Sequence, residues 1–397
     1  MGDLRSRNLI LELAVRAKQG VHNPASFMTE LRTQQQQYAC LRWLCHFKVL
    51  AHIPIAPSSL SYEELALASG VPKNTLRSVT RMVITMGFLC ETSEGRVAHN
   101  SLSAPFVEDP HLMTWLLHTN NHTVPYMNAM TEATERFGGS TEINETAFNI
   151  AAGTDLAFFP YLNSRPDLEK EFDAYMHCVS EVNDGLSADH LLNGFDWESL
   201  SEGAQVVDVG GGSGNTSLTV ARAFKKLRFI VQDQATPIAN AQRRKTETHR
   251  DEAWQRIALQ EHDFFGPQPV RGAEIYLLRM VIHDWPDEKA VQILQQLAQA
   301  MSPTSRLLIM DMVIPAPGST SIVFEAALRE KDLCMLQTCN AKEREGGDWR
   351  NLIRKINPPM SIRAIRRPDG CLPSVIEVAL GYDNHSTLVY GETLQAI

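Results

Sequence analysis

The 397-residue sequence has no run of 18 uncharged apolar residues, so it predicts no helix that crosses a membrane. It also lacks an excess of positive charge. Its 37 Lys and Arg residues against 46 Asp and Glu residues give a net charge of -9, which argues against a phosphate backbone as the main partner. The first twenty residues lack the long apolar run and the small-residue cleavage site of a signal peptide, so we expect no secretory leader. Hydrophobic residues make up 44% and charged residues 21%, as in a folded globular enzyme.

Paired cysteines are missing as well. The seven cysteines are an odd number, and the two nearest pairs, Cys40 with Cys45 and Cys334 with Cys339, are five residues apart. This is not the CxxC spacing of a zinc site. The sequence therefore predicts a reduced, cytoplasmic protein with no bound metal.

The region 1–110 has the pattern of a small helical domain. Ser61 and Glu64 have the spacing of a capping box, Gly70 ends the helix that follows, and Pro72 begins the next helix. Residues 87–100 then read as a hairpin that turns at 93–95, so the order is that of a winged helix. This region holds 11 Lys and Arg against 9 Asp and Glu, too small a surplus for a DNA-binding face. We interpret it as a dimerisation domain.

Residues 111–195 read as a mostly helical linker, and the pattern changes from residue 196 onward. There, short apolar strands alternate with amphipathic helices, which is typical of an α/β fold with a parallel sheet. The last two apolar segments, on either side of Asp369 and Gly370, predict an antiparallel hairpin that closes this domain. The predicted strands are 205–209, 228–232, 256–260, 274–279 and 306–312.

A glycine-rich turn carries the first functional signal. The strand VVDV is followed by Gly210, Gly211 and Gly212, and a helix begins directly afterwards. Such a turn lets the backbone approach a nucleotide-like cofactor, although it also occurs as a simple tight turn. Asp233 at the end of the next strand is placed to bind ribose hydroxyls, or else to cap a helix. Asn215 stands where a dinucleotide site has its third glycine, so the spacing favours another cofactor.

Polar residues also follow the later strands. Asp263 and Phe264 come after the third strand, where they could bind and stack on a purine or simply form a turn with a core aromatic ring. Arg279 and His283 end the fourth strand, Asp311 ends the fifth, and Glu343 lies in the segment AKER. His283 alone could instead cap a helix or satisfy a buried carbonyl.

Together, the motifs DVGGGSG, DFF, HDW and KER, with the acid at the end of the second strand, resemble the S-adenosylmethionine-dependent small-molecule O-methyltransferases of plants and fungi, the caffeate and flavonoid type. The resemblance covers nearly the whole chain. It implies a Rossmann-like methyltransferase domain from residue 196 to residue 397, preceded by a winged-helix dimerisation domain. It also implies a homodimer that acts on a hydroxylated small molecule.

The resemblance implies a cofactor site for S-adenosyl-L-methionine. In this family the glycine loop supports the methionine part, the acid after the second strand binds the ribose, and the DF pair contacts the adenine. A basic residue near the cofactor ends the fourth strand. The positions of this sequence that match are Gly210, Gly211, Gly212, Asp233, Asp263, Phe264 and Arg279.

The resemblance also implies the catalytic groups. His283 matches the general base, Glu343 and Asp311 match the two acids that orient it, and Met176 matches a methionine that holds the acceptor. A neutral imidazole can take the proton of a hydroxyl, which makes the oxygen a better nucleophile. A carboxylate on the other ring nitrogen fixes the tautomer. Asp311 is one methylene shorter than the expected glutamate, so its contact with His283 is expected to be longer or missing.

Two further interpretations stay open from the sequence. Fungal pericyclases with this fold bind the cofactor but rearrange or cyclise a substrate without transferring a methyl group. His122 keeps this alternative, because it could direct a polar group into the acceptor pocket, whereas His283 favours methyl transfer. A catalytically silent regulator that uses the winged helix is the third interpretation, and the small basic surplus disfavours it.

Overall fold

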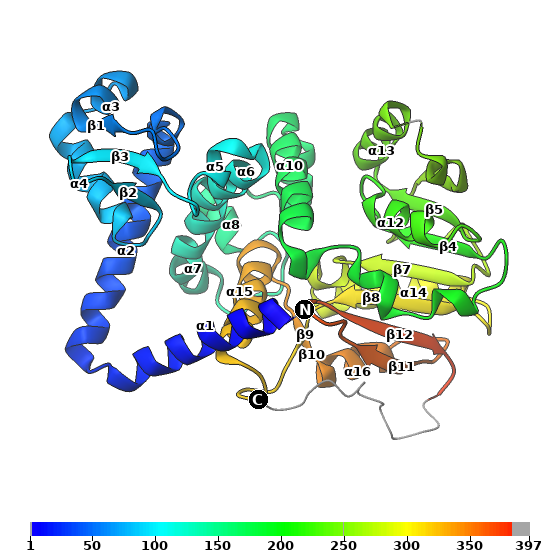
Figure 1. The fold of residues 1–397 in the computed structure, drawn as a ribbon. Coiled ribbons are helices and arrows are strands. Elements are labelled where there is room, and N and C mark those ends of the chain that lie inside the picture. Colours follow the sequence, from blue (N-terminus) through cyan, green and yellow to red (C-terminus); the bar gives the residue numbers. More distant parts are fainter. Residues whose placement is uncertain (1, 249, 383–397) are drawn as a thin grey trace. The chain divides into compact units, whose positions relative to one another are not determined.

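The protein is described here by a computed structural model, which covers residues 2–248 and 250–382 and divides into two compact units (Figure 1). Unit 1 consists of residues 1–125 with 167–182, and unit 2 consists of residues 126–166 with 183–397. A helical segment from the middle of the chain thus belongs to the N-terminal unit. The domain boundaries at residues 110 and 195 stay a prediction.

Unit 1 is mainly helical and has one small sheet. Its three strands are ordered β1-β3-β2, and all neighbouring strands are antiparallel. The elements of the unit are α1 (Gly2–Val21), α2 (Pro24–His46), η1 (Val49–His52), β1 (Leu60–Ser61), α3 (Tyr62–Ser69), α4 (Lys73–Ile84), β2 (Leu89–Glu91), β3 (Arg96–His99), α5 (Pro105–Glu108), α6 (Pro110–His118), the π-helical turn η2 (Thr119–Thr123) and α10 (Pro166–Val182).

The predicted helix-turn-helix and hairpin of unit 1 are confirmed. Ser61 and Glu64 form the capping box that begins α3, and Gly70 ends this helix with a φ of 69°. The next helix, α4, follows Pro72 and ends at Ile84. Leu44, Leu65 and other fully buried apolar side chains of α2, α3 and α4 form the core of this unit.

Unit 2 holds the α/β domain and several helices that precede it in the chain. The preceding helices are α7 (Val124–Phe137), α8 (Ala147–Ala152), α9 (Phe158–Asn163), η3 (Asp184–Leu186), α11 (His190–Gly194) and η4 (Trp197–Ser199). The domain itself contains β4 (Gln205–Val209), α12 (Asn215–Ala223), β5 (Arg228–Asp233), α13 (Ala235–Glu247), η5 (Glu252–Arg256), β6 (Ile257–Glu261), β7 (Ile275–Arg279), η6 (Ile282–Asp284), α14 (Asp287–Ala300), β8 (Arg306–Asp311), β9 (Val313–Ile314), α15 (Ile322–Cys339), β10 (Arg344–Glu345), α16 (Gly346–Arg354), β11 (Met360–Arg366) and β12 (Ser374–Leu380).

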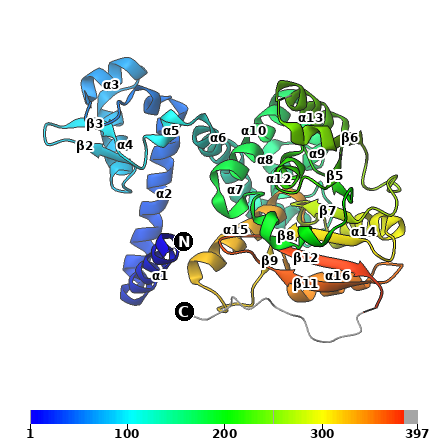
Figure 2. The ribbon, with the colours of Figure 1, turned by 45° about the vertical axis from the view of Figure 1, so that its right-hand side comes forward.

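The main sheet has seven strands in the order β11-β12-β8-β7-β4-β5-β6. The five strands from β8 to β6 are parallel, and β12 pairs antiparallel with both β8 and β11. The predicted α/β class and the antiparallel terminal hairpin are therefore confirmed, and each predicted strand lies within two residues of an observed one. Figure 2 shows α16 beside the β11–β12 hairpin.

Helices cover both faces of this sheet because alternate strand residues point to opposite sides. Val207 and Val209 pack with Ile293 of α14 in one buried cluster. Val206 and its neighbours pack with Leu218 of α12 in the other. The carboxyl ends of the parallel strands are left to carry polar residues, as is usual for ligand sites in open α/β sheets.

A second, two-stranded sheet was not predicted. The short strands β9 and β10 are parallel, and Arg344 is paired with Val313. This pairing brings the segment that contains Glu343 to the carboxyl end of β8. In the part of the chain that the structure describes, no helix is long and apolar enough to cross a membrane.

Candidate active site

The glycine-rich turn follows β4 and leads into α12. Gly210 and Gly212 have φ values of 71° and 56°, which other residues rarely adopt. A Cβ atom on Gly210 would lie 2.9 Å from Val281, whereas one on Gly212 would meet no atom within 4 Å. The turn is therefore packed on one side and leaves open space on the other, so the backbone there can approach a ligand closely.

Asp233 lies against this turn. The backbone N–H of Gly212 donates to Asp233 Oδ2 at 2.8 Å, and the N–H of Gln234 donates to Oδ1 at 2.7 Å. Burial raises the pKa of Asp233, while the two backbone hydrogen bonds act in the opposite direction. The structure thus brings Asp233 and the glycines together, as the sequence predicts, and places a carboxylate beside the open space.

Phe264 also lies beside the turn. One of its ring carbons is 3.6 Å from the position that a Cβ atom of Gly210 would take, and its ring is 5.8 Å from that of Trp285. Asp263 accepts a hydrogen bond from the N–H of Phe265 at 3.0 Å, so its carboxylate shapes this turn. The open space, the carboxylate of Asp233 and an aromatic ring fit an adenosine-type ligand.

Arg279 ends β7 and is buried in this region. It donates to the carbonyl of Leu186, and its Nε atom has no hydrogen-bond partner among the described residues. Burial lowers the pKa of Arg279, and the nearby carboxylate of Asp208 counteracts this effect. The predicted cationic residue is therefore present at the strand end, within reach of Asp208.

His283 forms the strongest polar contact of the site. It lies on η6, directly after β7, and its Nδ1 atom is 2.7 Å from Glu343 Oε1. The side chains of His283 and Glu343 are 6% and 1% exposed. Glu343 is held in turn, because its N–H donates to Asp332 Oδ1 at 3.0 Å. The predicted pairing of the imidazole with this carboxylate is present in the structure.

Asp311 contacts the backbone of His283. The hydrogen bond between them, 3.2 Å long, runs from the backbone N–H of His283 to Asp311 Oδ2, so Asp311 holds the loop and not the ring. This arrangement is in line with the longer or missing contact that its short side chain predicts. Another acid takes the place beside the second ring nitrogen: Asp284 Oδ1 lies 3.6 Å from His283 Nε2.

Two comparisons place this chain in a family. The model of the O-methyltransferase domain matches residues 135–356. The O-methyltransferase fsr2 of Gibberella fujikuroi is 49% identical over 378 residues, which cover 95% of this chain and 97% of that protein. The chain belongs to the O-methyltransferase family. It is an S-adenosylmethionine-dependent enzyme.

Solved structures share the fold of this O-methyltransferase. The mitomycin 7-O-methyltransferase MmcR is similar with a TM-score of 0.75 and 23% identity, over 93% of this chain and all of that one. A structure described as a pericyclic reaction enzyme is similar with a TM-score of 0.78 and 22% identity, over 94% of both chains. At these identities the similarity concerns the fold alone.

The carboxylates around His283 set its charge in the methyltransferase. Burial disfavours the imidazolium, but Glu343, Asp284 and Asp311 outweigh this effect and raise the pKa of His283 to about 10. Burial also raises the pKa of Asp284 to about 7, although His283 lowers it. The imidazole is therefore a strong base inside a negatively charged, buried cluster.

Arg344 is a buried residue of the site whose role the sequence did not reveal. Its side chain donates to the carbonyls of Ile282 and Trp285, on either side of the His283 loop, at 3.0 and 2.9 Å. It also forms two bonds with Asp287 Oδ1 at 2.9 and 3.0 Å. Arg344 follows Glu343 directly, so one short segment fixes both the ring of His283 and the loop that carries it.

The two predicted acceptor residues belong to unit 1. Met176 lies on α10 and is 37% exposed. His122 lies in the π-helical turn, where its Nε2 atom is 3.2 Å from Glu171 Oε1. The ring of its neighbour His118 is buried, and this burial lowers the pKa of His118 to about 3. His118, His122 and Glu171 therefore form a cluster within unit 1.

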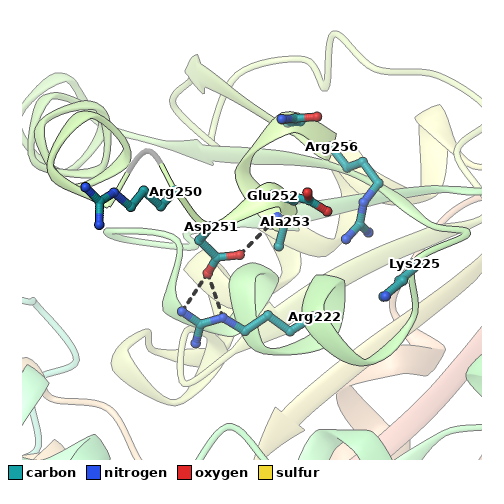
Figure 3. Close-up of a pocket in the computed structure, with 8 residues that line it drawn as sticks. Arg222, Lys225, Arg250, Asp251, Glu252, Ala253 and Arg256 are labelled. Carbon is teal, nitrogen blue, oxygen red and sulfur yellow. Dashed lines mark hydrogen bonds and ion pairs between the residues drawn. The ribbon is translucent and has the colours of Figure 1, made fainter.

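A surface pocket of about 420 Å³ lies elsewhere in unit 2, and none of the predicted site residues lines it. Figure 3 shows Arg222 pointing at Asp251, with which it forms an ion pair of 2.7 Å. Arg256 donates to carbonyls at the end of α12, including that of Ala221. Arg222 and Arg256 thus connect α12 with η5 and with Asp251, the residue that caps η5.

Proposed function

We propose that this enzyme transfers the methyl group of S-adenosylmethionine to a hydroxyl group of a phenolic or polyketide-like small molecule, with His283 as the general base. The observation that carries this proposal is the buried, 2.7 Å pair of His283 and Glu343 at the end of β7. A base held in this way is required to activate a hydroxyl group.

The glycine turn and the strand ends would hold the cofactor. Gly210, Gly211 and Gly212 would support its methionine part, and Asp233 would bind the ribose hydroxyls. Asp263 and Phe264 would contact the adenine, while Arg279 would lie close to the cofactor as a buried cation. S-adenosylmethionine supplies an electrophilic methyl group, so that an oxygen–carbon bond forms while the carbon–sulfur bond breaks.

Each residue around the imidazole has a separate task. Glu343 accepts the Nδ1 proton of His283, so the lone pair of the neutral ring is at Nε2, where it takes the proton of the acceptor hydroxyl. The carboxylate then stabilises the imidazolium that is formed. Asp311 holds the loop through the backbone N–H. Asp284, 3.6 Å from Nε2, adds a negative charge on the side where the proton arrives.

The basicity of His283 favours a phenol as the acceptor. A phenol has a pKa of about 10, and the pKa of His283 is also about 10. Proton transfer between a phenol and this base is therefore nearly balanced in free energy, but the ring must first lose its own proton at neutral pH. An aliphatic alcohol holds its proton much more tightly and would match this base poorly.

The acceptor side and the assembly are the less defined parts of the proposal. Met176 and His122 are proposed to contact the acceptor, in line with the family pattern. We also propose a homodimer formed through the N-terminal helices, because α1 and α2 expose large apolar residues such as Leu9, Ile10 and Phe27. Light scattering after size exclusion that gives a monomer at micromolar concentration would contradict the dimer.

A pericyclic rearrangement is the second candidate, since a pericyclic reaction enzyme has the same fold. An assay with labelled S-adenosylmethionine and a panel of phenols separates the two, with His283→Ala as the variant. Methyl incorporation that falls by roughly 10²–10⁴ in the variant supports the His-dependent methyltransferase. Cofactor binding without methyl transfer to any phenol would count against methyl transfer and place the rearrangement ahead of it, although it would not identify a pericyclase, and His122 would then be the residue to test.

A further inference from the structure

Unit 1 contains a cluster of two histidines and one acid that takes no part in the proposed proton transfer to His283. His118 ends α6, His122 lies four residues later in the π-helical turn, and Glu171 comes from α10. One possible ligand atom from each residue lies within 4.8 Å of the other two. Single π-helical turns inside helices are frequently found at functional sites.

The ring of His118 is fixed but lacks a polar partner. It is 9% exposed, and it stacks on Tyr175 with ring centroids 3.7 Å apart and an angle of 10° between the planes. Its Nδ1 atom is buried without a hydrogen bond to any described residue. A buried polar atom without a partner is rare and indicates a missing ligand, water or ion.

The other two groups already have the spacing of metal ligands. His122 Nε2 lies 3.2 Å from Glu171 Oε1, and the rings of His118 and His122 are 4.8 Å apart. A tetrahedral ion bound at about 2.0–2.1 Å keeps its ligand atoms roughly 3.3 Å apart. The His122–Glu171 pair matches this separation, and only the ligand atom of His118, within 4.8 Å of the other two, would have to move closer, by up to about 1.5 Å.

We propose that His118, His122 and Glu171 bind a divalent transition-metal ion of the zinc type, in a site separate from the catalytic His283. Two imidazoles and one carboxylate are donors that suit Zn²⁺, Co²⁺ or Ni²⁺, and three protein ligands leave a fourth position open. On binding, the ion takes the place of any proton on His122 Nε2: a neutral ring then carries its one proton on Nδ1, and an imidazolium releases one proton to solvent.

The spacing of the cysteines led to the expectation of a metal-free protein, but that argument concerns thiolate sites only. His118 and His122 are four residues apart, but Glu171 follows His122 by 49 residues, and only the fold brings it to the histidines. A bound ion would connect the π-helical turn to α10, the helix that carries Met176. An ion at His122 would also replace a direct contact between this histidine and the acceptor.

The proposal is tested on the full-length protein, purified without a histidine tag and treated with a chelator. Titration with Zn²⁺ alone in a calorimeter is expected to show one site per chain, and Co²⁺ is expected to give the visible absorption of a tetrahedral complex. His118→Phe keeps a ring to stack on Tyr175, and Glu171→Gln keeps a hydrogen-bond acceptor for His122. The Zn²⁺ affinity of both variants should fall by more than roughly 10–100-fold. A loss of that size is typical when a residue that only hydrogen-bonds to a metal ligand is removed.

His111→Phe is the matched control, because His111 also faces a second histidine, His177, at 5.2 Å between ring centroids. This control should bind Zn²⁺ like the parent protein. Circular dichroism in the presence of chelator shows which variants are folded. If His118→Phe does not fold, the Zn²⁺ affinity of Glu171→Gln decides the test. Less than half an equivalent of Zn²⁺ on the parent protein, or unchanged affinity in Glu171→Gln, would overturn the proposal.

Discussion

His283 Nδ1 and Glu343 Oε1 are 2.7 Å apart, although sixty residues separate them in the sequence. The contact exists because β10 pairs with β9, which places Glu343 at the carboxyl end of β8, next to the loop after β7. Both side chains are almost fully buried, so little solvent weakens the interaction. This pair therefore determines the tautomer, the orientation and the charge of the proposed base.

Glu343→Gln should lower kcat by roughly 10²–10⁴, since the neutral amide neither enforces the tautomer nor stabilises the imidazolium. The variant keeps the size of the side chain, so KM and cofactor affinity should change little. Steady-state kinetics with the best phenolic acceptor measure this effect. Asp311→Asn is the matched control: Asp311 bonds the backbone of His283, so its loss should reduce kcat far less. Equal losses in both variants would contradict the separate roles.

The rate should depend on pH through the neutral form of His283. With a pKa of about 10, the ring is protonated at neutral pH, so log(kcat/KM) should rise with a slope of about 1 between pH 7 and pH 10. The residual activity of His283→Ala reports the ionisation of the phenol alone. It is subtracted from the activity of the parent enzyme at each pH. In Glu343→Gln the rise should occur at lower pH. A profile of the parent enzyme that is flat from pH 7 to pH 10 would refute this assignment.

The same group should make the folded protein less stable at high pH. The pKa of His283 is higher in the folded state than its usual 6.5, so the folded protein binds more protons between pH 6.5 and pH 10. The stabilisation is therefore complete below pH 6.5 and is lost as the pH approaches 10. The free energy of unfolding should fall by at most about 1.4 kcal/mol per pH unit from this group. Urea titrations from pH 6 to pH 10 measure this fall in the free energy of unfolding. In Glu343→Gln the upper pH limit of the fall should be lower.

The sequence predicts the sheet well because each strand is a short apolar run followed by a local turn. The strand before Gly210 and the terminal hairpin around Gly370 carry their signals within a few residues. The capping box of Ser61 is equally local. Such elements depend on backbone propensity and on alternating burial, which a single sequence displays.

The unpredicted features depend on contacts between distant segments. Strands β9 and β10 have two residues each, too few for any periodic pattern, and yet they assemble the site. Asp284 is part of the HDW motif, but its position beside Nε2 follows from the turn η6. Arg344 belongs to the KER motif, and nothing in the sequence states that its partners are the carbonyls around His283. Long-range assembly of this kind needs the fold.

Arg344→Met should destabilise the protein by about 2–4 kcal/mol. The substitution removes the charged donor from the carbonyls of Ile282 and Trp285, and it removes from Asp287 a cation that lies closer, at 2.9 Å, than Lys342 at 3.6 Å. Arg344→Lys restores the charge but not the several directed bonds, so its stability should be intermediate. Chemical unfolding measures the free energy of unfolding of the parent protein and of the two variants. If Arg344→Met were as stable as the parent protein, the proposed support of the His283 loop would be wrong.

Gly210→Ala and Gly212→Ala separate the packing of the glycine turn from its contact with the cofactor. Both positions have positive φ, so either substitution should cost about 1–2 kcal/mol through the backbone. At Gly210 the new Cβ atom also meets Val281 at 2.9 Å, which adds to the loss of stability. At Gly212 it projects into open space, where the cofactor is proposed to lie. Gly212→Ala should therefore unfold at a higher urea concentration than Gly210→Ala and still bind S-adenosylmethionine weakly by calorimetry. Cofactor affinity like that of the parent protein in Gly212→Ala would place the methionine part of the cofactor away from this turn.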